Sequence, residues 1–90
     1  MPTFPGAGYG SLGDQLRPAA ISMPLNIAEA AGRLSEADAA RHYGIARGSA
    51  MECAAIVDAL SLLGTIAAAD HEIATTLLGR LVAMLTRLAR

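Results

Sequence analysis

The sequence predicts an all-α protein: an antiparallel helical bundle with three helices in this chain. The apolar residues make up 53% of the 90 positions and are mostly Ala and Leu, with one Phe, two Tyr and no Trp. Ala and Leu favour close-packed helices, whereas strands are rich in β-branched and aromatic residues. The apolar residues also recur at spacings of three and four, the period of a helix that buries one face.

The N-terminal third is expected to contain a lead-in and a proline-containing helix. Residues 1–10 hold two prolines and three glycines, which predicts an extended segment before a single helical-bundle domain over residues 11–90. The first helix should run from about Ser11 to Ala31. Pro18 and Pro24 lie inside it, and a proline inside a helix costs roughly 3 kcal/mol. We therefore expect a helix kinked at proline, or two short pieces with Ser22 capping the second.

The second helix is expected from about Glu36 to Leu63. Ser35 is a good N-cap, Asp38 stands where a capping-box acid reaches back, and Gly64 ends the helix. Its apolar residues form one seam of mostly small side chains, which lets helices approach closely: Ala39, Tyr43, Ala46, Ala50, Cys53, Val57 and Leu60.

The third helix is expected to start at Asp70 as N-cap and to end near Ala89. Arginines crowd its last turns, where they suit the helix dipole and need no functional explanation. Its apolar stripe comprises Ala74, Leu78, Leu81, Leu85 and Leu88, widened by Ile73, Leu77 and Met84. A 90-residue domain has too small a core to bury this much apolar surface, so we expect oligomerisation to complete or extend the bundle.

The charge, the single cysteine and the short uncharged runs argue against a strongly nucleic-acid-binding, secreted or membrane-spanning protein. Seven Arg, no Lys and eight acidic residues give a net charge of −1, so no global field attracts nucleic acid or an anionic membrane. Cys53 is the single cysteine, and the N-terminus lacks the features of a signal peptide, which together indicate a cytoplasmic protein. The uncharged run 59–69 has 11 residues, well short of the roughly 20 that span a bilayer.

One polar group stands out in the first helix. Asn26, Glu29 and Arg33 share a helical face, and Glu29 with Arg33 forms a favourable i, i+4 pair. We expect a polar clasp that fixes the register of the bundle; the alternative is a surface that lines a ring or grips a partner. A lone Glu without a second carboxylate, a metal set or a nucleophile gives catalysis little support.

The three soft metal ligands of the chain are His42, Cys53 and His71. None is spaced like a zinc site, and no phosphate-cradling glycine loop is present, so neither a metal nor another cofactor is expected. His42 is expected at the surface or at a subunit contact, His71 at a helix start, and Cys53 in the seam as a small hydrophobe.

Four arginines could form a local basic patch for RNA: Arg17, Arg33, Arg41 and Arg47. Phosphate contacts of this kind supply most of the affinity of nucleic-acid-binding proteins. Four acidic residues lie within this span or just before it and cancel these arginines by count: Asp14, Glu29, Glu36 and Asp38. Ordinary solvated helix faces are therefore the simpler interpretation.

A set of residues between about 9 and 60 carries a family resemblance. The set comprises Tyr9-Gly10, Gln15-Leu16-Arg17, Ala19-Ala20, Ser22, Pro24, Asn26-Ile27-Ala28-Glu29, Gly32-Arg33, Ser35, Ala46, Gly48-Ser49 and Glu52. On this pattern the chain resembles the small bacterial four-helix-bundle family that includes proteins encoded in intervening sequences of 23S rRNA genes. A related branch serves as accessory proteins of retroelement reverse transcriptases. Pro18 and Ala30 depart from the family pattern, and the family's long first helix is missing here.

The resemblance implies an antiparallel bundle that assembles into a ring, typically of five subunits, with no known enzymatic activity. We therefore expect a non-catalytic, self-associating protein with a scaffold or partner-binding role, whose partner is protein or RNA. The alternative is a nucleic-acid or ribonucleoprotein accessory factor. The residues expected at subunit or partner contacts are Asn26, Glu29, Arg33 and Tyr43, with Gly44 and Gly48 as a small-residue step that would admit another helix.

Overall fold

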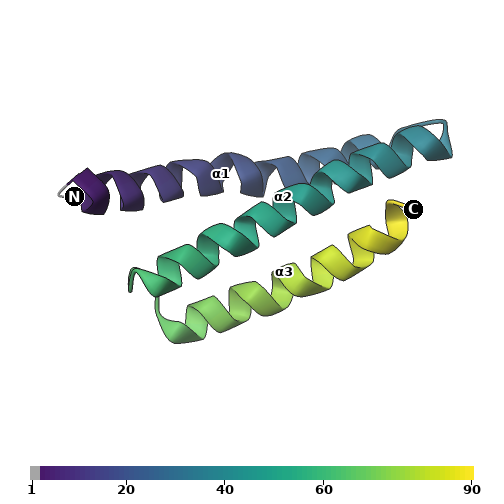
Figure 1. Ribbon diagram of the computed structural model, residues 1–90. Coiled ribbons are helices and arrows are strands. Elements are labelled where there is room, and N and C mark those ends of the chain that lie inside the picture. Colours follow the sequence, from purple (N-terminus) through teal and green to yellow (C-terminus); the bar gives the residue numbers. More distant parts are fainter. Residues whose placement is uncertain (1–2) are drawn as a thin grey trace.

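The computed structural model describes residues 3–90, with side chains from Ser11 onward, and within that range the chain is all-α (Figure 1). Its elements are α1 (Thr3–Ala31), α2 (Glu36–Leu62) and α3 (Ala68–Leu88). The predicted class and the predicted number of helices in this chain are confirmed.

Helix α1 begins earlier than the sequence suggested. Residues 3–10 were expected to be extended, but they are helical and extend α1 back to Thr3. The expected extended segment also included residues 1 and 2, which lie outside the described residues. The prediction counted the prolines and glycines of residues 1–10 as helix breakers. Pro5 falls in the first turn, where backbone N–H groups have no intrahelical acceptor, so it removes no helix hydrogen bond.

Helix α1 also continues through both of its internal prolines. Pro18 and Pro24 deprive the carbonyls of Asp14 and Ala20 of their usual donors, and both of these residues are exposed to water. Ser22 does not cap a second piece, because its hydroxyl accepts a hydrogen bond from Asn26 Nδ2 at 3.0 Å inside a continuous helix. A kink at these prolines stays a prediction.

The expected ends of α2 are close to those observed. Ser35 is the N-cap, and its hydroxyl accepts from the backbone N–H of Asp38 at 3.0 Å. The carboxylate of Asp38 does not reach back to complete a capping box; it faces two arginines instead. Gly64 adopts a φ of 75°, a left-handed conformation that suits glycine and follows the end of the helix.

The start of α3 was predicted incorrectly. The N-cap is Ala67, which offers no side-chain hydrogen bond, and Asp70 lies inside the first turn. Asp70 stabilises this end through the helix dipole rather than as a cap. The apolar stripe predicted for α3 also divides between two faces. Leu78 and Leu85 are buried, whereas Ile73, Leu77, Met84 and Leu88 are exposed.

Helix α2 lies between the other two helices and packs against both (Figure 1). Among the described residues, no Cα of α1 comes within 8 Å of a Cα of α3. The predicted seam is confirmed at its centre, where Ala46 and Ala50 are 0% exposed and Cys53 is 2% exposed. Ala50 and Cys53 form one core cluster with Ala19 of α1 and Leu78 of α3.

The resulting molecule is open and elongated. Its extents are 50 × 24 × 15 Å and its radius of gyration is 14.9 Å, against roughly 12 Å for a compact chain of this length. Its accessible surface is 5636 Å², against roughly 4900 Å² for a folded monomer of this mass. Large apolar side chains account for part of this surface: Ile21, Leu25, Leu34, Ile45, Met51, Leu62, Ile73, Leu77, Met84 and Leu88.

None of the described helices combines the length and the hydropathy needed to cross a bilayer.

Candidate functional site

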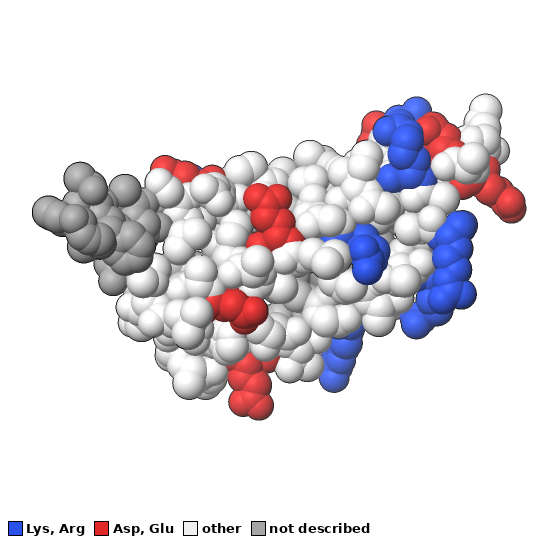
Figure 2. Space-filling model, in the orientation of Figure 1, with Lys and Arg blue, Asp and Glu red and all other residues white. Residues whose placement is uncertain are grey.

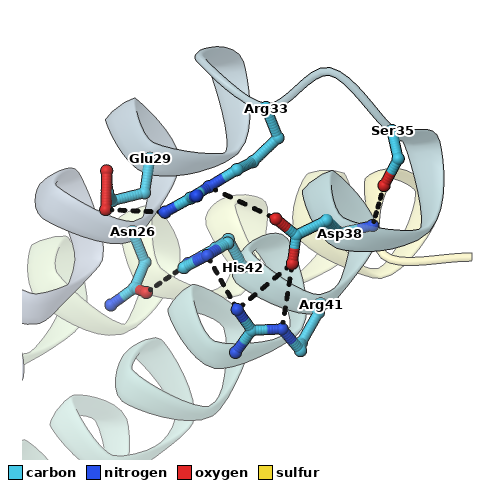
Figure 3. Close-up of polar contacts among 7 residues, drawn as sticks. All are labelled: Asn26, Glu29, Arg33, Ser35, Asp38, Arg41 and His42. Carbon is cyan, nitrogen blue, oxygen red and sulfur yellow. Dashed lines mark hydrogen bonds and ion pairs between the residues drawn. The ribbon is translucent and has the colours of Figure 1, made fainter.

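A polar network joins α1 to α2 near the turn between them (Figure 3). Its inner part starts at Asn26, whose Nδ2 donates to the backbone carbonyl of Ser22 at 2.9 Å and to the Ser22 hydroxyl at 3.0 Å. The Ser49 hydroxyl of α2 donates to the same Ser22 hydroxyl at 2.8 Å. Asn26 Oδ1 lies 3.2 Å from His42 Nδ1 of α2. These contacts fix the register of the two helices.

The hydrogen-bond partners of the His42 ring fit one of its two tautomers. Because the amide nitrogen of Asn26 donates to Ser22, its oxygen faces His42, and the ring Nδ1 must therefore carry the proton. The other ring nitrogen, Nε2, lies 3.1 Å from Arg41 Nη2, a group that can only donate. The arrangement fits the Nδ1–H tautomer, in which Nδ1 donates to Asn26 Oδ1 and Nε2 accepts from Arg41.

His42 was expected at the surface or at a subunit contact, and this expectation was wrong. His42 is only 8% exposed. Its side chain lies between α1 and α2, where it contacts Asn26. The signal that could have placed it is its spacing, since His42 stands one helical turn before Ala46 on the buried seam.

The outer part of the network consists of exposed ion pairs (Figure 3). Arg41 lies 3.2 Å from Asp38 Oδ1, and Arg33 Nε lies 3.4 Å from Asp38 Oδ2. Arg33 Nη2 also pairs with Glu29 Oε1 at 2.9 Å, the i, i+4 pair expected from the sequence. The four side chains are 37–61% exposed, and such pairs contribute about 0–1 kcal/mol each.

The residues expected at contacts occupy two separate places. Asn26, Glu29 and Arg33 all belong to the polar network, although Asn26 turns toward His42 and away from the Glu29–Arg33 pair. Gly44 and Gly48 belong to a different surface of α2. A Cβ atom added at either glycine would meet nothing within 4 Å, so no part of the described chain packs on this step. Tyr43, next to it, is half-buried.

The four arginines considered for RNA do not form one patch. Arg17 stands 14 residues before Ala31, the last residue of α1, a distance of about 21 Å along the helix, and Arg33 lies beyond that end. Arg33 and Arg41 are paired with Asp38. Arg47 points to α3, where its Nε donates to the Thr86 hydroxyl at 2.7 Å.

The fold distributes the charges unevenly along the long axis, a feature that the sequence analysis missed. In Figure 2 the visible arginines lie toward one end, together with some carboxylates, and the rest of this face carries carboxylates alone. The contacts Ser22–Ser49 and Asp58–His71 show which segments lie at about the same height in the antiparallel bundle. Residues 23–49 and 79–90 form a basic half, and residues 11–22 and 50–78 form an acidic half. The basic half contains Arg33, Arg41, Arg47, Arg80, Arg87 and Arg90 with Glu29, Glu36 and Asp38. The acidic half contains Asp14, Glu52, Asp58, Asp70 and Glu72 with Arg17.

The remaining chemistry-bearing side chains have structural partners. His71 Nε2 lies 2.7 Å from Asp58 Oδ1 and ties α3 to α2. Cys53 lies in the buried seam, as expected, and burial, followed by the nearby charge of Glu52, raises the pKa of its thiol. In the part of the chain that the structure describes, no three His, Cys, Asp or Glu side chains gather in a way that could hold a metal ion.

Comparison with known proteins identifies a family for this chain. A family model described as 23S rRNA-intervening sequence protein matches residues 2–87. No curated protein and no solved structure matches the chain. The match extends over nearly the whole chain, beyond the segment 9–60 that carried the resemblance.

Proposed function

From the premise that this chain belongs to the 23S rRNA-intervening sequence protein family, we propose that it is a non-catalytic, self-associating helical-bundle protein with a scaffold or partner-binding role. The observation that carries the proposal is the uncovered apolar surface of all three helices. Ile21 and Leu25 of α1 are 52% and 60% exposed, and Met51 of α2 is 48% exposed. Monomers rarely leave so many large apolar side chains in water.

The amount of surplus surface agrees with this proposal. The chain exposes roughly 700 Å² more than a folded monomer of its mass is expected to expose. A standard protein–protein interface buries about 800 Å² on each partner. The surplus is therefore close to one side of such an interface.

The step at Gly44 and Gly48 is the surface of α2 that we assign to a neighbouring helix. Both glycines are open to the outside, and small residues let two helix backbones approach closely. Tyr43 would border this contact. The exposed Glu29–Arg33 pair would lie at the same end of the molecule as the two glycines. The family resemblance implies a ring of five copies, which requires two different surfaces to meet around the ring.

The test is the solution mass by light scattering, measured in a dilution series and in high salt. A stable oligomer supports the proposal, and a monomer that keeps its helical circular dichroism refutes it. Gly48→Leu probes the contact surface, because the added side chain meets no atom of its own chain but would block an approaching helix. Gly79→Leu is the matched control, since Gly79 of α3 is equally open.

A ribonucleoprotein accessory role is the second candidate, and the division of charge favours it. Arg80, Arg87 and Arg90 of the basic half have no carboxylate within 4.0 Å among the described residues. Together with Arg47 they present a basic surface where α3 ends. Each phosphate contact made by such a surface adds to the salt dependence of binding.

This candidate is tested with a fluorescently labelled RNA hairpin in an anisotropy titration at several salt concentrations. Arg87→Ala should weaken binding and reduce the slope of log K against log salt by about one, whereas Arg17→Ala, in the acidic half, should change neither. Binding that is absent at low salt, or equally affected by both variants, contradicts the assignment.

A further inference from the structure

The outer face of α3 carries a line of large apolar side chains that the described chain does not cover. Ile73, Leu77, Met84 and Leu88 are 60%, 53%, 46% and 51% exposed. At 100° per residue they fall within about 60° of one another around the helix axis. Leu78 and Leu85 are buried and lie roughly 100° around the axis from the centre of this line, and Leu78 packs in the core cluster with Ala50 and Cys53 of α2. A helix with two apolar faces needs two partners, and the described chain supplies one.

We infer that this outer face binds the same face of a second copy, with the two α3 helices antiparallel around a two-fold axis. The inference rests on the proposed self-association and adds the surface, direction and symmetry of one contact. The four apolar residues are spaced by four, seven and four positions, a pattern that reads the same from either end. An axis between Arg80 and Leu81 therefore sets Ile73 opposite Leu88 of the second copy, and Leu77 opposite its Met84.

The charges of α3 select the antiparallel direction. Asp70 and Glu72 lie near its start, and Arg87 and Arg90 lie at its end. The antiparallel arrangement brings the acidic start of one copy to the height of the basic end of the other, and it also opposes the two helix dipoles. A parallel arrangement would match the apolar residues equally well but would place like charges together. Charge complementarity thus specifies direction, while apolar burial drives association.

This contact differs from the one that would close a ring. A two-fold contact uses the same patch on both copies and pairs them, whereas a ring joins two different patches. The step at Gly44 and Gly48 is on another helix and stays free for a second contact. An assembly that uses the α3 contact therefore contains an even number of copies, whether a single pair or two paired rings.

Arg80 gives the inference a distinctive consequence. It lies beside the apolar line, next to the proposed axis, so the two-fold contact brings the Arg80 side chains of both copies near each other. Removing this repulsion with Arg80→Leu should lower the dissociation constant of the pair about tenfold. If the face bound an anionic partner instead, the same substitution would weaken binding. A dissociation constant that is unchanged or higher contradicts the two-fold contact.

Cysteine cross-linking tests the geometry directly, in a Cys53→Ala background whose helicity is verified first. Leu77→Cys mixed with Met84→Cys should give disulfide-linked pairs under mild oxidation. Leu77→Cys alone should not, because its two copies would be about 10 Å apart along the axis, beyond the reach of a disulfide. Gly79→Cys, exposed on another side of α3, is the control for random collision.

Each outcome distinguishes the inference from the proposed function. A monomeric mass with no cross-link refutes self-association and the α3 contact together. A stable oligomer in which Leu77→Cys links to itself, or in which the mixed pair links no better than Gly79→Cys, refutes only the antiparallel α3 contact. An oligomer with an odd number of copies also refutes only the antiparallel α3 contact.

A charge exchange supplies an independent test. The double variant Asp70→Arg/Glu72→Arg makes both ends of α3 basic, and Arg87→Glu/Arg90→Glu makes both ends acidic. Each variant alone should show at least a fivefold loss of affinity through α3, and an equimolar mixture should restore association at low salt. If the mixture associates no better than either variant, the antiparallel pairing is refuted.

Discussion

Ala50→Leu is the sharpest test of how this chain is held together. Ala50 is 0% exposed at the centre of α2 and belongs to the core cluster that also contains Ala19 and Leu78. Helices on both sides of α2 approach this position, so three extra carbon atoms have no cavity to fill. Overpacking of this kind costs about 1–3 kcal/mol. A domain of this size shifts its Tm by about 4–8 °C per kcal/mol, which predicts a decrease of about 4–24 °C.

The assay is thermal unfolding followed by circular dichroism at 222 nm, with the mass measured at the same concentration. Ala83→Leu is the matched control, because Ala83 is an exposed position in the interior of α3. It should leave the Tm within about 4 °C, since surface substitutions usually change stability by less than about 0.5 kcal/mol. A similar Tm for Ala50→Leu and wild type would mean that the small-residue seam is not tightly packed.

Three further predictions follow from individual contacts. A double-mutant cycle between Asn26→Ala and His42→Ala should give a coupling energy of about 0.5–1.5 kcal/mol in urea unfolding, the usual range for one hydrogen bond; additive effects would exclude the contact. Gly64→Ala should lower stability by about 1 kcal/mol, because its φ of 75° disfavours a side chain, and an unchanged urea midpoint would contradict this. Cys53 should react with a thiol reagent only on unfolding, because burial raises the pKa of its thiol above the ordinary 9.0. Since the folded chain holds that proton more tightly, stability should fall as pH rises past 9; rapid labelling at pH 7 would show that the thiol is accessible.

The sequence was most accurate where structure depends on neighbouring residues. Ser35 starts α2 through a hydrogen bond to the N–H of Asp38, three residues away. Gly64 follows the end of α2 with a backbone conformation that suits glycine. Both features involve only nearby positions. The failures at Pro5 and Asp70 are also local, but they concern first turns, where a proline is harmless and a helix can start without a side-chain cap. Local preference alone does not decide such starts.

The sequence by itself determined the helical class, the small-residue seam and the Glu29–Arg33 pair, because helical periodicity fixes which residues share a face. Only the tertiary structure decided that His42 meets Asn26 between two helices and that Arg47 meets Thr86. These partners are far apart along the chain, and the antiparallel packing on α2 brings them together. The same packing separates charges that cancel by count into a basic half and an acidic half, and it leaves the outer face of α3 uncovered.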